Sequence, residues 1–357
     1  MTTQSAPPSH QEADQAAPTR PVERANLRSK LLGSLDPRRV SALYVLLAIV
    51  VLFSFWVPDT FLQVATLRQV FNSNAIIGIA ALCLTVPLSA RVFDLSFAYT
   101  MSLSGVTAAH FIAEKDWSVV LAVAAALVVA LVVGVINAVV VVIMRVDSLI
   151  GTLATGSIIQ AFITFVTGEM PITNAKLFGT FSDIGQKDVG GFILPVYYML
   201  GIALVTWYVM EHTARGRRIY ATGFNTEAAR LTGIQTKRIQ FTSLLVSSVI
   251  AGWAGVVLAA VLGTGSPTAG TPYLLPAFAA AFLGATQITP GRFNARGTVL
   301  GVVTLGVGIT GLSLATAPTW AANMFTGVVL IAALATTTVQ RKPKSPGSGW
   351  RSKLRRA

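Results

Sequence analysis

The chain has 357 residues, of which 53% are hydrophobic and only 11% are charged, and its formal net charge is +13. A soluble domain carries about 25% charged residues, so this composition excludes an ordinary soluble protein and predicts a polytopic membrane protein. The single cysteine, Cys83, excludes a disulfide framework or thiolate metal site within one chain, and three scattered histidines make no metal cluster.

Residues 1–39 are rich in Pro, Ala, Gln, Thr and charged side chains, which predicts a disordered cytoplasmic tail. This segment is too long and too polar for the n-region of a signal peptide. No small-residue cleavage site follows the first apolar run, so we interpret that run as an uncleaved span.

Ten apolar runs follow, and none of them contains Asp, Glu, Lys or Arg. One such charge at the centre of a membrane helix costs roughly 2.5–3.5 kcal/mol on an insertion scale, and about 20 apolar residues cross the hydrocarbon. The predicted fold class is therefore all-α, a transmembrane helical bundle of about ten spans in one domain, residues 40–340. The runs are 40–57, 70–90, 95–113, 119–143, 149–167, 195–210, 241–262, 274–289, 298–316 and 320–339.

The Lys and Arg residues predict the sidedness of these spans. We place the N-terminus in the cytoplasm and count the 27 Lys and Arg residues on each side. All of them then lie in cytoplasmic segments except Arg68, Lys115, Lys176 and Lys187. This asymmetry indicates that both termini are cytoplasmic. The basic C-terminal tail, 341–357, is expected to fix the orientation of the chain in the membrane and to contact anionic lipid. No aromatic interleaving or binding motif accompanies the charge, so we expect no nucleic-acid partner.

Between the sixth and seventh runs lies a polar loop, residues 213–240, with six Lys or Arg residues. It contains a helix-like core, Thr226–Leu231, which is preceded by Asn225, a good N-cap residue, and followed by Gly233, a good stop signal. A simple connector needs fewer residues. The capped helix therefore predicts a docking surface.

Two features of the C-terminal half allow two interpretations each. The charge-free segment 263–275 is either an outer loop or a re-entrant segment, where irregular backbone must lie against protein or a water-filled cavity. Small residues recur every four positions in the seventh run and either pack against another helix or line a pathway. They are Ser247, Ala251, Gly255, Ala259 and Gly263.

The sequence contains no arrangement that indicates an enzyme. It has no Walker motif, and the G-x-G-x-x-G at Gly306, Gly308 and Gly311 lies inside an apolar run, where glycine packing explains it better than a dinucleotide site. We expect no catalytic residue, cofactor or metal on this chain. No pair of membrane-embedded carboxylates is present to relay protons, which disfavours a proton-coupled carrier.

Neutral polar and aromatic residues within the runs suit a hydroxyl-rich solute, although each of them can instead bond a neighbouring helix or sit at the interface. Asp94 either caps the third span and pairs with Arg91 or acts in gating. The candidate translocation-path residues are Asp94, Ser96, Tyr99, Asn137, Gln160, Tyr273, Gln287 and Asn323.

Several stretches carry a family resemblance. Residues 216–234, GRRIYATGFNTEAARLTGI, resemble the cytoplasmic loop of the ribose-type permease family of ABC importers. Phe93–Gly105, FDLSFAYTMSLSG, is similar to that family's I-D-L-S-V-G-x-x-M-x-L-x-G element. Gly263–Tyr273 and Leu283–Gly301 resemble two further glycine-rich stretches, so the resemblance runs in register from about residue 40 to 340.

The resemblance implies a bacterial inner-membrane permease that works as a dimer. A cytoplasmic ATPase, which holds ATP and Mg, would dock on the loop, and an extracytoplasmic binding protein would deliver a monosaccharide such as ribose or xylose. The coupling residues would be Asn225, Glu227, Ala228, Ala229, Arg230, Leu231 and Gly233. In this interpretation Ala228, Ala229 and Leu231 enter a groove on the ATPase, while Glu227 and Arg230 hold the register.

The sequence departs from the family pattern at several positions. Arg91–Val92 replaces Gly-Gly, Asp147–Ser148 replaces Pro-Pro, and Leu274 and Pro276 replace an acidic pair. The alternatives are the same machine with a nucleoside or branched-chain amino acid as cargo, a secondary carrier or channel, and a scaffold or receptor without transport. The long capped loop favours an ATPase partner over a secondary carrier.

Overall fold

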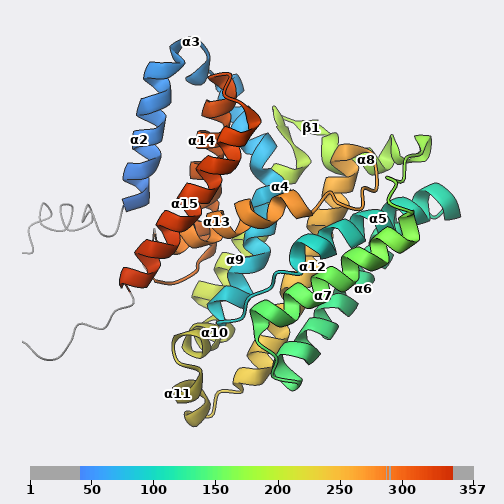
Figure 1. The fold of residues 1–357 in the computed structure, drawn as a ribbon, viewed down its shortest axis with the longest axis vertical. Coiled ribbons are helices and arrows are strands. Elements are labelled where there is room, and N and C mark those ends of the chain that lie inside the picture. The colour runs from blue at the N-terminus through green and yellow to red at the C-terminus, as the bar shows by residue number, and fades with distance from the viewer. Residues whose placement is uncertain (1–40, 287, 289–290, 341–357) are drawn as a thin grey trace, which may run out of the picture. The chain divides into compact units, whose positions relative to one another are not determined.

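The structure is a computed structural model, and it describes residues 41–286, 288 and 291–340 (Figure 1). The predicted tails, 1–39 and 341–357, and the candidate path residue Gln287 lie outside the described residues.

The described chain is almost entirely helical. The first half contains α2 (Ser41–Trp56), α3 (Pro58–Phe61), α4 (Val64–Ser89), α5 (Phe97–Lys115), α6 (Val119–Ala138), the π-helical turn η1 (Val139–Ile143) and α7 (Ser148–Thr167). A compact connection follows, with η2 (Ala175–Leu177), α8 (Thr180–Gln186) and a small antiparallel hairpin of β1 (Asp188–Val189) and β2 (Phe192–Ile193). The second half contains α9 (Leu194–His212), α10 (Ala214–Phe224), α11 (Thr226–Leu231), α12 (Thr236–Leu262), η3 (Thr271–Tyr273), α13 (Leu274–Ala285), α14 (Ala295–Leu314) and α15 (Thr319–Gln340).

The all-α class is confirmed, and each of the ten predicted runs contains a helix. Seven of the described helices are long and apolar enough to cross a membrane, while α2 and α13 are shorter apolar helices. Helix α5 carries several hydroxyl side chains and is mostly buried among its neighbours. The count of ten spans and the cytoplasmic placement of both termini remain predictions.

Helices α4, α5 and α12 form the centre of the bundle. Helix α12 packs on α5, α6 and α4, and α14 packs on α4 and α13. Ser247, Ala251 and Gly255 of the small-residue stripe are buried in the α5–α12 contact, where a Cβ at Gly255 would overlap the carbonyl of Met101. The stripe therefore brings two backbones close together, as its packing interpretation predicts.

The segment between α12 and α13 folds back onto α5. Gly265 pairs with Ile172 in an isolated antiparallel bridge, and the Gly270 amide donates to Ser102 Oγ at 2.9 Å. A Cβ at Gly270 would overlap the carbonyl of Ala98. This irregular backbone thus lies against protein, as a re-entrant segment requires, and the choice between a re-entrant segment and an outer loop stays a prediction.

Two departures from the family pattern have local explanations. Arg91 has φ 61°, a left-handed conformation that glycine adopts without strain and that the family's usual Gly-Gly would suit. Asp147 is the N-cap of α7, and its Oδ1 accepts from the amides of Leu149 and Ile150 at 3.0 and 3.3 Å. This cap starts the helix where the family uses prolines.

Candidate functional site

The loop 213–240 contains two helices, α10 and α11, before α12 begins. The predicted helix Thr226–Leu231 is confirmed: Asn225 Oδ1 accepts from the Ala228 amide at 3.0 Å, and Gly233 lies beyond the helix end with φ 85°. Helix α10 was not predicted, because Gly216 and Gly223 weaken its helix propensity.

The exposed surface of this loop differs from the predicted one. Ala229 is only 6% exposed, and its carbonyl accepts from the Ile234 amide at 3.1 Å, so the expectation that Ala229 enters a partner's groove is wrong. Leu231 is 78% exposed and Phe224 is 86% exposed. Glu227 pairs with Arg230 at 2.6 Å in solvent. The apolar docking candidates are therefore Phe224, the last residue of α10, and Leu231, the last residue of α11.

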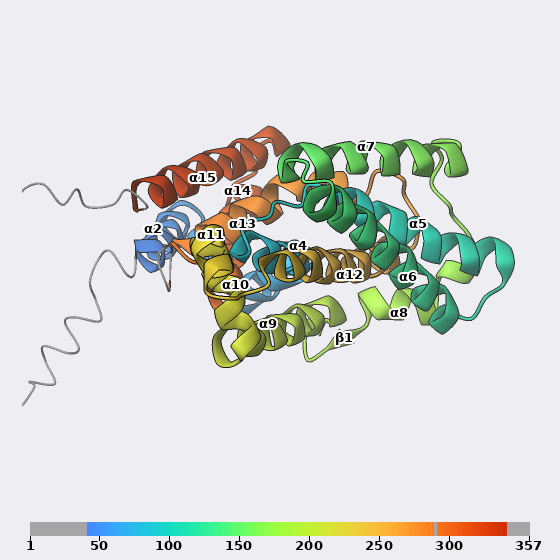
Figure 2. The ribbon, with the colours of Figure 1, turned by 90° about the horizontal axis from the view of Figure 1, so that it is seen from below.

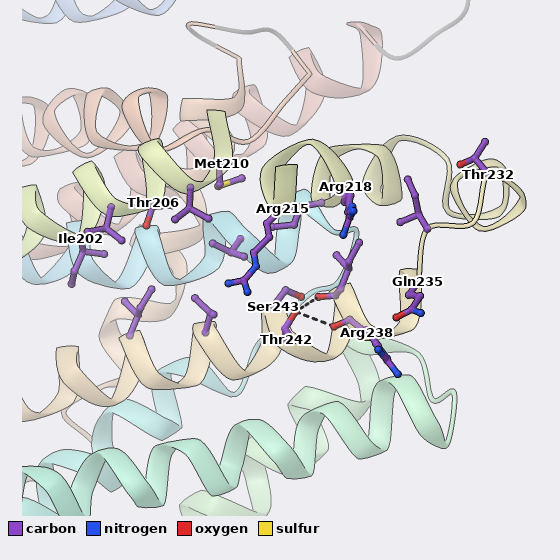
Figure 3. A pocket seen from close by; sticks show the side chains of 18 of the residues that line it. Ile202, Thr206, Met210, Arg215, Arg218, Thr232, Gln235, Arg238, Thr242 and Ser243 are labelled. Carbon is purple, nitrogen blue, oxygen red and sulfur yellow. Dashed lines mark hydrogen bonds between the residues drawn. The ribbon is translucent and has the colours of Figure 1, made fainter. Parts of the chain in front are cut away.

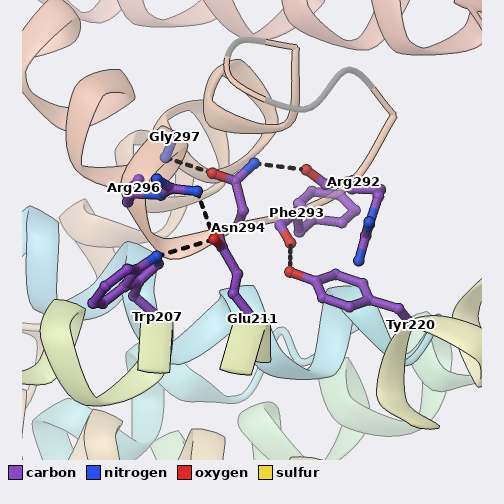
Figure 4. A network of polar contacts seen from close by, with 8 residues as sticks. All are labelled: Trp207, Glu211, Tyr220, Arg292, Phe293, Asn294, Arg296 and Gly297. Carbon is purple, nitrogen blue, oxygen red and sulfur yellow. Dashed lines mark hydrogen bonds and ion pairs between the residues drawn. The ribbon is translucent and has the colours of Figure 1, made fainter. Parts of the chain in front are cut away.

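Tyr220 fixes α10 to the segment that precedes α14 (Figure 4). Its hydroxyl donates to the Phe293 carbonyl at 2.9 Å, and the Arg292 guanidinium lies 3.8 Å from the centre of its ring. Burial raises the pKa of Tyr220 and the charge of Arg292 opposes that rise, so the phenol stays protonated and remains a donor at neutral pH. A Cβ at Gly223 would overlap the Ser89 carbonyl, so α10 also lies directly against the end of α4.

A second contact joins the end of α9 to the start of α14. Glu211 Oε2 accepts from Arg296 Nη2 at 2.5 Å and from Trp207 Nε1 at 3.0 Å (Figure 4). Asn294 caps α14, where its Oδ1 accepts from the Gly297 amide at 2.7 Å. The Tyr220 contact thus attaches the loop to the α13–α14 connection, and the Glu211 contact attaches the end of α9, directly before the loop, to the start of α14.

The same connection reaches an aromatic cluster inside the bundle. The ring of Phe293 lies 5.2 Å from that of Phe282, in an edge-to-face arrangement. Phe282 in turn lies 6.3 Å from Phe278 and 6.5 Å from Phe93. Tyr220 and Phe293 thus connect α10 to this cluster through direct contacts.

Tyr220→Phe tests the first attachment. The variant loses one partly buried hydrogen bond, so we expect about 1 kcal/mol of destabilisation, with membrane insertion unchanged. The measurement is thermal unfolding of the purified chain in detergent. The matched control is Tyr208→Phe in α9, because Tyr208 is 59% exposed and its hydroxyl makes no hydrogen bond within the described residues. Equal melting temperatures for the two variants would show that the bond to Phe293 does not fix α10.

Three of the candidate path residues form one buried cluster. Asp94 Oδ1 accepts from the amide and the hydroxyl of Ser96 at 3.0 and 2.6 Å, and Asp94 Oδ2 accepts from Ser247 Oγ at 2.8 Å. Asn137 Nδ2 donates to Ser96 Oγ at 2.6 Å. Asp94, Ser96 and Asn137 are each 0% exposed. The cluster joins the start of α5 to α6 and α12.

The expected ion pair between Asp94 and Arg91 is absent from the described residues, because Arg91 points to solvent while Asp94 is enclosed. The expected capping role of Asp94 is confirmed in part, because Asp94 binds the residue that caps α5 and is not itself that residue. Asp94 holds Ser96, the residue that precedes α5, through both its backbone and its side chain. Asp94 therefore fixes the non-helical chain between α4 and α5 inside the bundle.

The remaining described path candidates lie apart from this cluster. Tyr99 packs on Gly156 of α7, and Gln160 Nε2 lies 3.4 Å from the Pro267 carbonyl in the segment 263–275. Gln160 Oε1 is buried without a partner in the described residues. Tyr273 is partly buried at the start of α13, and Asn323 is exposed on α15. Tyr99 and Gln160 therefore lie at the contacts that α7 makes with α5 and with the segment 263–275.

The sequence reasoning missed the residues that attach the loop. Arg292 and Arg296 were counted only as positive charges, and Tyr220, Phe293 and Glu211 were not singled out. The available signal was the alternation of cationic and aromatic residues around Asn294, an N-cap type.

Comparisons with known proteins agree with one another. The family described as the branched-chain amino acid transport system permease component matches residues 66–334. The ribose import permease protein of Escherichia coli strain K12 is 32% identical over 305 residues, which cover 84% of this chain and 92% of the relative. The L-arabinose ABC transporter permease protein of Azospirillum brasilense is 29% identical over 298 residues, or 83% and 86% of the two chains. The fructose import permease protein of Rhizobium meliloti is 28% identical over 300 residues, or 82% and 83%. No solved structure matches this chain.

Proposed function

This chain belongs to the family of membrane permease subunits of ATP-binding-cassette importers, and from that membership we propose that it carries a monosaccharide across the bacterial inner membrane. The observation that carries the proposal is the similarity over 92% of the ribose import permease. Relatives named for arabinose and fructose support the same solute class. The neutral polar groups Gln160, Tyr273 and Asn323 suit a hydroxyl-rich solute, because amides and phenols exchange hydrogen bonds with hydroxyls.

The energy and the solute come from partner chains in this proposal. A cytoplasmic ATP-binding subunit, which holds ATP and Mg, docks at the loop 213–240, and an extracytoplasmic binding protein delivers the sugar. Exposed Phe224 and Leu231 provide the apolar part of the docking surface, and the adjacent Glu227–Arg230 pair provides its polar rim.

A second permease copy completes the path in this proposal. Helix α15 is the least buried of the long apolar helices, since only 11% of its membrane-spanning stretch lies inside the protein. Figure 2 shows α7 and α15 along the same side of the bundle. A second copy facing this side would enclose Gln160, Tyr273 and Asn323 between the two chains. Anionic lipid at the basic C-terminal tail remains part of the proposal.

Coupling follows from the attachments of the loop. When the ATPase subunits close, they move α11 and α10. Tyr220 and Glu211 pass that movement to the α13–α14 connection, and Phe293 passes it to Phe282 and Phe278. The aromatic cluster lies next to α15 and lines a cavity of about 540 Å³ with Leu330 and Leu334. It is therefore placed to open or close the cytoplasmic end of the path.

The test is reconstitution of the permease with its ATPase in liposomes. Binding proteins loaded with ribose, arabinose, fructose, a nucleoside or leucine are added in turn. We expect ATP hydrolysis and uptake to rise only with a loaded sugar-binding protein. Stimulation by leucine alone would move the proposal to amino acids. Uptake driven by an ion gradient without ATP would replace the importer with a secondary carrier.

A further inference from the structure

A deep groove separates α9 from α12 on the side of the bundle away from α7 and α15 (Figures 2 and 3). Both helices pack on α4, and Val86 of α4 lines the groove between them. The groove has a volume of about 1260 Å³, which exceeds the range of roughly 300–1,000 Å³ for sites of drug-sized ligands. A ligand larger than a sugar fits it.

The walls of the groove are apolar along most of its length. Ile202, Val205 and Val209 come from α9, and Val246 and Ile250 come from α12. From Thr242 to Ile250 the wall runs about 12 Å at 1.5 Å per residue. Beyond it, the rings of Tyr198 and Trp253 meet at 5.2 Å and bridge the two helices. Exposed Val205 and Val246 show that the groove is open toward the surface that lipid covers.

Three arginines line the opposite end of the groove. Arg215 and Arg218 extend from α10 toward α12, whereas Arg238 lies in the first turn of α12 and its guanidinium points away from α10 (Figure 3). None of them makes an ion pair within the described part of the chain. The two acidic residues nearby are already engaged, because Glu211 pairs with Arg296 and Glu227 pairs with Arg230. The groove is therefore apolar at one end and strongly cationic at the other.

We propose that this groove binds one anionic phospholipid, with an acyl chain along α9 and α12 and the phosphate between Arg215 and Arg218. Arginine presents paired N–H groups that match phosphate oxygens, and its charge is permanent. Basic residues at the cytoplasmic face attract anionic lipid. The proposal rests on the proposed function only in taking the chain to lie in a membrane with the loop 213–240 at the cytoplasmic face. A lipid bound here would contact α10 and the connection 232–235, which join the docking helix α11 to the bundle.

Two variants of the full chain separate the headgroup from the acyl chain. The double variant Arg215→Gln, Arg218→Gln removes two phosphate partners. Its matched control is the double variant Arg217→Gln, Lys237→Gln. The control removes two exposed charges of the same loop that do not line the groove. Gly201→Leu fills the apolar half, because Gly201 lines the groove and a Cβ there meets no atom within 4 Å. Leucine also favours the helix more than glycine does.

The measurement is the phospholipid that stays with the purified chain, counted by native mass spectrometry during titration with phosphatidylglycerol or phosphatidylcholine. Each arginine near an anionic surface contributes about fivefold in affinity, so the arginine pair should weaken phosphatidylglycerol binding about 25-fold. Gly201→Leu should weaken it as well, which a site for free phosphate would not show. The control pair and phosphatidylcholine binding should be unchanged.

Equal losses in the arginine pair and in the control pair would overturn the proposal in favour of diffuse attraction. Unchanged lipid binding in the arginine pair, together with lost ATPase association, would assign the groove to the protein partner. Both readouts are independent of the transported solute, so failure of the lipid site leaves the sugar proposal intact.

Discussion

Leu231→Glu is expected to abolish stable association with the ATPase subunit while the chain still inserts and folds. Leu231 is 78% exposed at the end of α11, so a carboxylate there disturbs no contact inside the permease. In a docked complex the same carboxylate would be buried in an apolar contact. The loss of a central apolar anchor costs about 2 kcal/mol or more, so affinity should fall at least about 30-fold. Co-purification of tagged permease with the ATPase measures this loss.

The control for that variant is Met144→Glu in the connection between α6 and α7. Met144 is also an exposed apolar residue, at 65%, and the connection lies on the cytoplasmic side in the predicted topology. It should retain the ATPase. Phe224→Glu should behave as Leu231→Glu does, because Phe224 is exposed at the end of α10, directly before α11. Full ATPase association in both the Phe224 and the Leu231 variants would show that the docking surface lies elsewhere.

The sequence predicted the elements whose signals are local. Charge-free runs predicted the helices, and Asn225 and Gly233 predicted α11, because capping and termination act within a few residues. Orientation within the loop was not predictable in the same way. Ala228 and Ala229 are identical neighbours, yet only Ala229 is buried, because the Ile234 amide folds back onto its carbonyl. A change at Ala229 therefore disturbs the loop itself.

The long-range contacts were beyond sequence reasoning for a different reason. Asp94 and Ser247 lie 153 positions apart, and Tyr220 and Phe293 lie 73 apart. Neither pair carries a motif that names its partner. The pattern around Asp94 indicated a capped helix start, but only the fold shows that this start lies inside the bundle and not at the membrane surface.

Asp94→Ala is expected to prevent most of the protein molecules from folding. It removes the acceptor of the Ser96 amide, the Ser96 hydroxyl and the Ser247 hydroxyl, all within the protein interior. Each buried group left without a partner costs about 1–3 kcal/mol, and three such losses are comparable to the whole stability of many proteins. The yield of monodisperse chain on size-exclusion chromatography in detergent measures the effect.

Asp94→Asn separates the structural role of this residue from a role of its charge. The amide oxygen can still accept from Ser96, and the new NH₂ group can donate to the Ser247 hydroxyl oxygen, so most of the cluster is retained. We therefore expect Asp94→Asn to fold and to transport. Because Ser247→Ala removes one donor and leaves Ser96 paired, it should be milder than Asp94→Ala. A folded Asp94→Asn chain that binds its ATPase but does not transport would show instead that translocation requires the carboxylate, and Asp94 would then belong to the gate.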